Sequence, residues 1–176
     1  MDSPRLIQIV YGEGAGKTTM ALGKAIRAHG SGLKVAVVQF MKPGNIWWIK
    51  GKPETSIISP MRSLGIDVYS YGREVFVNEP TQLDHEFAIK AFEKAVELNP
   101  VVDVLVLDEL LNAISFGLIQ TENVTKFIKT RGDTELILTG QKLPEEIKAI
   151  ADQITRVVTE EHPFKNGGSA RKGFEY

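Results

Sequence analysis

The chain has 176 residues, of which 43% are hydrophobic and 24% charged, a balance typical of one globular domain. A formal net charge of −1 gives no support to a general nucleic-acid or membrane role, and the absence of cysteine excludes disulfides, thiolate metal sites and a cysteine nucleophile. The N-terminal sequence is neither a signal peptide nor a membrane span. We therefore expect a cytoplasmic protein that binds neither nucleic acid nor membrane.

Short apolar runs rich in β-branched residues predict strands at 5–11, 34–40, 66–71, 103–109, 134–139 and 154–159. Several are nearly continuous in valine, isoleucine and leucine, as strands covered by helices on both faces must be. Helical patterns alternate with them at 17–29, 81–100 and 143–152. This alternation predicts an α/β fold with a mainly parallel sheet. No domain boundary is visible, so we expect a single domain over 1–176, with loops at 41–62 and in the tail at about 160–176.

The helical patterns predict which side chains face the core. The first helix places Met20, Ala21, Ala25 and Ile26 on one face. The second opens with Thr81 and Asp84 as a variant capping box, with aspartate in place of the usual glutamate or glutamine. Its apolar residues are Leu83, Phe87, Ala91, Ala95 and Leu98.

The stretch VYGEGAGKTTMA, residues 10–21, nearly spells a phosphate-binding loop. The usual pattern is glycine, four free residues, then Gly-Lys-Ser/Thr. Here Tyr11 stands where the first glycine is expected, and the nearest glycine is Gly12, so the loop is one residue short. The loop nevertheless follows a predicted strand and precedes a predicted helix, which is the context that the motif requires.

The residue types of this loop suit an anion. Gly12, Gly14 and Gly16 let backbone amides turn toward a phosphate, and the helix N-terminus adds partial positive charge. Lys17 adds a full charge, and the Thr18 hydroxyl is of the kind that ligates Mg²⁺. The alternative is a glycine-rich turn without a ligand.

A second motif lies at the end of the predicted strand 103–109. Asp108 and Glu109 follow an apolar run, and in parallel α/β folds ligands bind at the carboxyl edge of the sheet. An acid at the end of a strand beside a phosphate loop typically holds the metal. The alternative is an acid that complements the dipole of a following helix.

Three segments together resemble the P-loop-type ATP:corrinoid adenosyltransferases. They are YGEGAGKTTMALGKAIRAHGSGLKVAVVQFMK, LVLDELLNAISFGLI and LILTGQKLPEEIKAIADQITRVVTEEHPFKNGGSARKGFEY. The shortened loop is characteristic of this family. The resemblance implies a RecA-like P-loop fold, a sheet of about six strands with helices on both faces, an unusual ATP orientation and a homodimer. It also implies transfer of the 5′-deoxyadenosyl group of ATP to the cobalt(I) of cob(I)alamin or a cobinamide-type corrinoid, with release of triphosphate.

On this basis we predict three sets of site residues. Catalysis would rest on Lys17, Thr18 and Glu109, and Mg²⁺ or Mn²⁺ would be held by Thr18, Asp108 and Glu109. The residues expected to bind ATP or the corrinoid are Gly12, Glu13, Gly14, Ala15, Gly16, Lys17, Thr18, Thr19, Lys42 and Phe76. Lys42 belongs to this set because it ends a predicted strand at the ligand edge.

The chain departs from the family pattern at several positions. Glu13 and Ala15 stand where relatives usually have asparagine and lysine, which removes a cation and adds an anion near the phosphates. Relatives carry an aromatic pair before the long helix, and here Phe76 alone is a candidate for that role. Trp47 and Trp48 are a possible substitute, a dimer contact or a buried anchor.

Two other functions remain open. A P-loop ATPase or nucleoside kinase would share the loop, but needs a positioned water or a catalytic base for its acceptor. A module that binds ATP or a corrinoid without catalysis would also share it. The sequence leaves open the preferred corrinoid and a partner reductase, and the tail at about 160–176 is a candidate cover for the active site.

Overall fold

A computed structural model of the protein describes residues 4–43, 46–49, 52–55, 58–73, 77–162 and 167. In chain order the elements are β1 (Ile7–Tyr11), α1 (Lys17–Gly30), β2 (Val35–Phe40), β3 (Ile46–Ile49), β4 (Lys52–Thr55), α2 (Ile58–Ser63), β5 (Asp67–Tyr71), α3 (Gln82–Leu98), a 3₁₀ turn η1 (Asn99–Val101), β6 (Val104–Asp108), α4 (Leu110–Ser115), α5 (Thr121–Lys129), β7 (Glu135–Gly140), α6 (Glu145–Lys148) and β8 (Gln153–Arg156).

Six of the strands form one sheet in the order β5-β2-β6-β7-β1-β8, and every neighbouring pair is parallel. β3 and β4 pair separately as an antiparallel hairpin. The sheet register sets Tyr11 beside Gly140 and Gln39 beside Asp108. The carboxyl ends of β1, β2, β6 and β7 therefore meet at one edge, and β7 separates the strand of the glycine loop from the strand of the acids.

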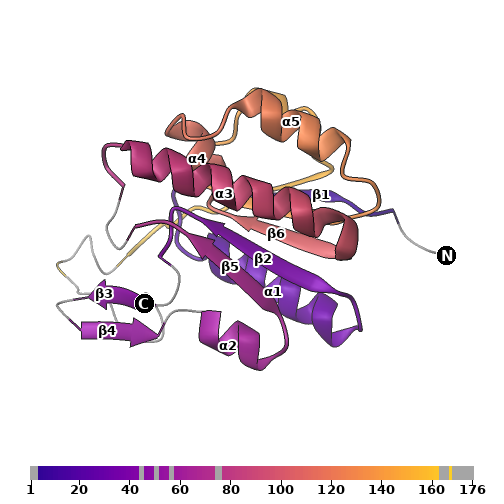
Figure 1. The fold of residues 1–176 in the computed structure, drawn as a ribbon, viewed down its shortest axis with the longest axis horizontal. Helices are drawn as coiled ribbons and strands as arrows, with labels where there is room; N and C mark the ends of the chain where they lie inside the picture. Colours follow the sequence, from indigo (N-terminus) through magenta and orange to yellow (C-terminus); the bar gives the residue numbers. More distant parts are fainter. Residues whose placement is uncertain are drawn as a thin grey trace.

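Helices cover both faces of the sheet. α3, α4 and α5 lie on one face, and α1 and α2 lie on the other (Figure 1). The alternation of side chains along each strand divides the core accordingly. In β1, Ile9 packs with the cluster under α3, α4 and α5, while Val10 packs with Ala21 and Ala25 of α1. The predicted α/β, RecA-like P-loop fold, with about six mainly parallel strands and helices on both faces, is confirmed.

The expected loop at 41–62 is wrong, because β3, β4 and most of α2 lie within it. Helices α4 and α5 were also not predicted. α4 spans 6 residues, too few to show a helical period, and it begins directly after Glu109 without a side-chain cap. Such short elements are decided by packing against the sheet and not by local pattern.

The predicted apolar face of α1 is confirmed at Ala21 and Ala25 but is wrong at Met20 and Ile26. Met20 and Ile26 are 38% and 43% exposed, whereas Ala21, Leu22 and Ala25 are buried. Small alanine side chains let the helix lie close to the sheet, which turns the larger residues outward. In α3 the predicted Ala91, Ala95 and Leu98 are buried together with Ala88, whereas the predicted Leu83 is exposed.

The predicted start of α3 is confirmed. Asp84 Oδ2 accepts hydrogen bonds from the Thr81 backbone N–H at 2.8 Å and from the Thr81 hydroxyl at 2.7 Å. Arg73 adds a bidentate contact, from Nε and Nη2 to the two Asp84 oxygens, at 2.7 Å each. Arg73 follows β5, so this buried carboxylate joins the end of an edge strand to the start of a helix. None of the helices in the described part of the chain is long and apolar enough to cross a bilayer.

Candidate active site

The predicted site residues of the glycine loop, of Lys42 and of the acids come together at the carboxyl edge of the sheet. The loop follows β1, Lys42 lies two residues beyond β2, and Asp108 ends β6. Parallel strands bring these ends together, although Thr18 and Asp108 lie 90 positions apart in sequence.

The glycines of the loop are required by a close approach of the backbone. Gly12 has φ of 120°, and a Cβ there would lie 2.4 Å from the carbonyl oxygen of Val157. A Cβ on Gly14 would lie 2.8 Å from the same oxygen. The chain that leaves β8 therefore passes directly over the loop, and a side chain at either position would collide with it.

The amides of the loop are divided between two roles. Gly14 N–H donates to Val157 O at 3.1 Å, and Ala15 N–H donates to Thr159 Oγ1 at 2.9 Å. The helical hydrogen bonds begin with Met20 N–H donating to Gly16 O at 2.8 Å. The N–H groups of the intervening residues 17–19 precede this bond, so they form the positive N-terminus of α1 that suits an anion.

The predicted residues around these amides are accessible. Glu13, Ala15, Gly16 and Thr19 are exposed, and Lys17 and Thr18 are partly buried. Lys17 Nζ donates to Gly14 O at 2.7 Å, which folds this side chain back over the loop. Its ammonium thus lies beside the backbone segment that the motif assigns to phosphate.

Asp108 is a fully buried carboxylate at the centre of the site. Its Oδ1 accepts hydrogen bonds from the hydroxyls of Thr18 and Thr139, both at 2.8 Å. Its Oδ2 accepts hydrogen bonds from Gln39 Nε2 at 3.0 Å and from Lys42 Nζ at 2.8 Å. Burial alone would raise the pKa of Asp108, but the charge of Lys42 and these hydrogen bonds outweigh it and hold the pKa below its ordinary value. Asp108 is therefore ionised in the folded protein.

Glu109 is held differently from its neighbour. It has φ of 64°, and its N–H donates to Thr139 Oγ1 at 2.9 Å. Its Oε2 accepts a hydrogen bond from Asn112 Nδ2, and its Oε1 lies 3.8 Å from Lys42 Nζ. Burial raises the pKa of Glu109, the negative charge of Asp108 raises it further, and Lys42 opposes both.

The three residues predicted to hold a metal surround one cationic atom. Lys42 Nζ lies 2.8 Å from Asp108 Oδ2, 3.2 Å from Thr18 Oγ1 and 3.8 Å from Glu109 Oε1. Hydroxyl and carboxylate oxygens are the donors that Mg²⁺ prefers. The donor set therefore fits a divalent cation, with two carboxylates and one hydroxyl. In the described part of the chain, this site contains only two acidic side chains. Among the described residues there is no group of three or more His, Cys, Asp or Glu side chains that could hold a metal ion.

Three supporting residues were missed in the sequence. Thr139 and Gln39 hold Asp108, and Asn112 holds Glu109. A signal was present for two of them, because Gln39 and Thr139 are polar residues that follow apolar runs in strands ending at the ligand edge. Asn112 had no such signal, since α4 itself was not predicted.

Other predicted features lie outside the described residues. Phe76 is one of them, and so is most of the tail at about 160–176. Trp47 and Trp48 belong to β3, of which the backbone alone is described. Their proposed roles remain predictions.

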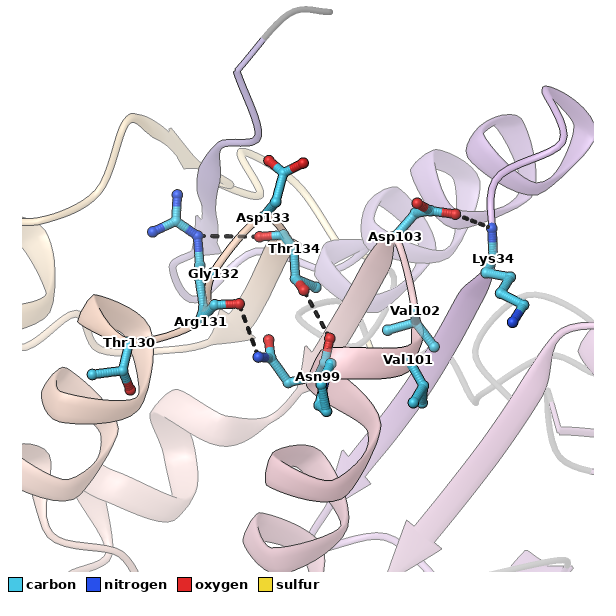
Figure 2. Close-up of a pocket in the computed structure, with 11 residues that line it drawn as sticks. Lys34, Asn99, Val101, Val102, Asp103, Thr130, Arg131, Gly132, Asp133 and Thr134 are labelled. Carbon is cyan, nitrogen blue, oxygen red and sulfur yellow. Dashed lines mark hydrogen bonds between the residues drawn. The ribbon is translucent and has the colours of Figure 1, made fainter.

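A pocket of about 690 Å³ lies at the opposite, amino edge of the sheet (Figure 2). Its walls are structural: Asn99 Nδ2 donates to Arg131 O at 2.9 Å, and Thr134 Oγ1 donates to Asn99 O at 2.8 Å. The Arg131 guanidinium donates to the carbonyls of residues 5, 128 and 134, so it braces the loop before β7. Within the described part of the chain, Asn99 Oδ1 is buried and has no hydrogen-bond partner. None of the site residues predicted from the sequence lines this pocket.

The parallel sheet and the glycine loop between β1 and α1 define a P-loop α/β protein. Residues 3–176 match the family ATP:corrinoid adenosyltransferase BtuR/CobO/CobP. The chain belongs to this family. It is a transferase that moves an adenosyl group to a corrinoid.

Individual relatives are similar over almost the whole chain. A corrinoid adenosyltransferase of Pseudomonas aeruginosa is 32% identical over 181 residues, which cover 99% of this chain and 85% of the relative. Corrinoid adenosyltransferase CobA of Salmonella typhimurium is 30% identical, with 97% and 85% covered. A corrinoid adenosyltransferase of a Sinorhizobium species is 29% identical, with 99% and 82% covered.

Proposed function

We propose that the site at the carboxyl edge binds ATP with Mg²⁺ and stabilises intact triphosphate as the leaving group of the adenosyl transfer. The observation that carries this proposal is the set of Thr18, Asp108 and Glu109 oxygens around one cation beside the N-terminus of α1. Such an arrangement of oxygens beside a helix N-terminus suits a triphosphate with its bound metal ion.

The reaction needs charge stabilisation more than proton transfer. Cobalt(I) of the corrinoid donates an electron pair to the 5′ carbon of the ATP ribose, a cobalt–carbon bond forms, and the carbon–oxygen bond breaks. The bonding electrons leave with triphosphate, and cobalt is oxidised formally to cobalt(III). The nucleophile carries no proton, so no general base is required. The protein has to hold the two reactants in line and stabilise the departing anion.

The residues of this chain divide that task. The amides at the start of α1 and the Lys17 ammonium bind the phosphates. Thr18, Glu109 and Asp108 would hold Mg²⁺ through their hydroxyl and carboxylate oxygens. Mg²⁺, when bound, supplies positive charge to the triphosphate oxygens. Glu13 is exposed at the loop, where it suits the ribose hydroxyls and not the phosphates.

A P-loop ATPase is the second candidate, and one observation favours it. Glu109 lies beside the site with a raised pKa, as a residue that orients or deprotonates water would. However, its Oε2 is engaged by Asn112 and its Oε1 faces Lys42. The family does not favour hydrolysis, nor does it favour a module without catalysis.

The remaining proposals concern the assembly. We propose that the chain is a single domain whose tail at about 160–176 covers the active site, that it works in the cytoplasm as a homodimer, and that a reductase delivers the electron that makes cobalt(I). Family membership supports these proposals. Light scattering at micromolar concentration tests the dimer, and a monomer would contradict it.

The phosphorus product separates the candidate functions. With ATP, Mg²⁺ and a corrinoid kept as cobalt(I) by a strong reductant, we expect triphosphate to form in proportion to a light-sensitive cobalt–carbon species. Phosphorus NMR distinguishes triphosphate from ADP. ADP formed without a corrinoid would establish hydrolysis instead, and tight ATP binding with neither product would establish a binding module. We expect a base-free corrinoid to react at least as readily as cobalamin, since Phe76 alone stands where relatives have an aromatic pair.

A further inference from the structure

We propose that Lys42 is the resident cation of the metal site: in the nucleotide-free protein its ammonium neutralises Asp108, and it leaves when a divalent cation enters with ATP. The inference rests on the proposed ATP and Mg²⁺ site and adds to it an order of binding. The metal would enter as its complex with the nucleotide and not before it.

The first step is the position of the ammonium. Lys42 Nζ contacts Asp108 Oδ2 at 2.8 Å and Thr18 Oγ1 at 3.2 Å. Glu109 Oε1 lies 3.8 Å away. These atoms come from three separate elements, α1 and the ends of β2 and β6. The side chain of Lys42 is 19% exposed, so the ammonium lies within the site and not on its rim.

The second step is the need for a cation at this point. Asp108 has no exposed surface, and its other partners are the neutral groups of Thr18, Thr139 and Gln39. A buried carboxylate without a compensating charge is strongly unfavourable. Lys42 supplies that charge when no metal is present, which explains why a lysine lies in a site built for a divalent ion.

The third step is exclusion. Mg²⁺ binds oxygen ligands at about 2.0–2.1 Å. A metal that contacts Thr18 Oγ1 and the adjacent carboxylates would overlap the space of the ammonium, because Lys42 Nζ contacts the same oxygens. Two cations at that distance also repel each other strongly in a buried site. Lys42 and the metal therefore compete for one position.

The fourth step concerns what moves. The backbone at Lys42 is fixed: Met41 has φ of 57°, and a Cβ on Gly72 would lie 2.4 Å from Lys42 N and 2.6 Å from Met41 C. The end of β5 thus packs against residues 41 and 42. Displacement of the ammonium requires a rotation of the flexible lysine stem and no change of the fold, and the N-terminus of α1 lies beside it for a phosphate to receive the charge.

Binding of Mn²⁺ to the nucleotide-free protein, followed by electron paramagnetic resonance, tests the proposal directly. Lys42→Met should bind Mn²⁺ at least about ten-fold more tightly than the wild type, since the competing charge is gone. Lys17→Met is the matched control, because it removes a neighbouring ammonium whose hydrogen bond goes to the Gly14 carbonyl and not to a carboxylate. The gain should vanish in Lys42→Met combined with Glu109→Gln.

Thermal unfolding shows whether the Lys42→Met variant is folded and whether Mn²⁺ binds to its folded state. Lys42→Met should melt below the wild type, and Mn²⁺ without nucleotide should raise its melting temperature while leaving that of the wild type unchanged. Equal Mn²⁺ affinity of wild type and Lys42→Met, or an equal gain in Lys17→Met, would overturn the competition. Failure of the wild type to bind ATP would instead refute the proposed function and leave the Mn²⁺ comparison interpretable.

Discussion

Lys42 and Asp108 form an ion pair of 2.8 Å in which the carboxylate has no exposed surface. This pair makes stability depend on pH. The pKa of Asp108 is held below its ordinary value of 3.8 despite burial, mainly by Lys42. The unfolded chain therefore takes up the proton first, and the stabilisation from Asp108 is complete above the unfolded pKa and is lost as pH falls through the lower folded pKa.

Asp108→Asn should lower the free energy of unfolding by about 3–5 kcal/mol at pH 7, because Lys42 and three other donors lose a buried acceptor charge. The difference from wild type should shrink as the pH falls below the ordinary carboxylate range. Urea unfolding at pH 7 and pH 3, followed by circular dichroism, measures both. Glu145→Gln, in an exposed ion pair with Lys148, is the control and should change stability by less than about 1 kcal/mol. A difference that is constant with pH would contradict the assignment.

In contrast to Asp108→Asn, Glu109→Gln should raise the free energy of unfolding at neutral pH. The pKa of Glu109 is raised by burial and by Asp108, so its ionisation opposes folding, and that effect grows as pH rises through the folded pKa. We expect the variant to gain up to about 1 kcal/mol at pH 7 and to gain less at pH 4. Its Mg²⁺-dependent ATP binding should fall sharply.

Urea unfolding measures the expected gain in stability. Calorimetric titration with ATP, with and without Mg²⁺, measures the expected loss of Mg²⁺-dependent binding. Glu13→Gln is the matched control, since Glu13 is an exposed acid of the glycine loop and should leave stability unchanged. A Glu109→Gln variant that unfolds more easily than wild type at pH 7 would show that the carboxylate stabilises the fold.

Gly12→Ala should destabilise the protein by at least about 2 kcal/mol. The new Cβ would lie 2.4 Å from Val157 O, at a φ of 120° that side chains avoid. Gly23→Ala provides the contrast, because Gly23 lies inside α1 and its Cβ would meet nothing within 4 Å. That substitution should stabilise by about 0.5–1 kcal/mol through helix propensity. Thermal melts of the two variants compare them, and similar melting temperatures would refute the close approach.

Lys17→Ala should weaken ATP binding by about 2–3 kcal/mol, roughly 30- to 100-fold, because a charged hydrogen bond to phosphate is lost. The fold should persist, since the described contact of Lys17 Nζ is a single hydrogen bond to Gly14 O. Lys24→Ala in the same helix is the control, because Lys24 bonds to Gln8 and should leave ATP affinity unchanged. If calorimetry finds that Lys17→Ala binds ATP with wild-type affinity, the assignment of this loop as the phosphate site is wrong.

Local pattern in the sequence was sufficient for the sheet and for the position of the loop. Every residue of Val35–Phe40 is buried, and its nearly continuous apolar run predicted a strand covered on both faces. Thr81 and Asp84 marked the start of α3, since a capping box is a contact between residues three positions apart. The glycine loop and the pair Asp108-Glu109 were recognisable because each motif consists of residues that are adjacent in the sequence.

Contacts between distant residues were decided only by the tertiary structure. Lys42 meets Asp108 across 66 positions, and Thr18 meets it across 90. The sequence placed each of them at the ligand edge, but it could not show that the ammonium lies at the position predicted for the metal. That depends on the register of β2 against β6 and on the packing of Gly72 against the backbone of Lys42. A local pattern reports the conformation of its own segment, whereas the charge balance of a buried site depends on which segments the sheet brings together.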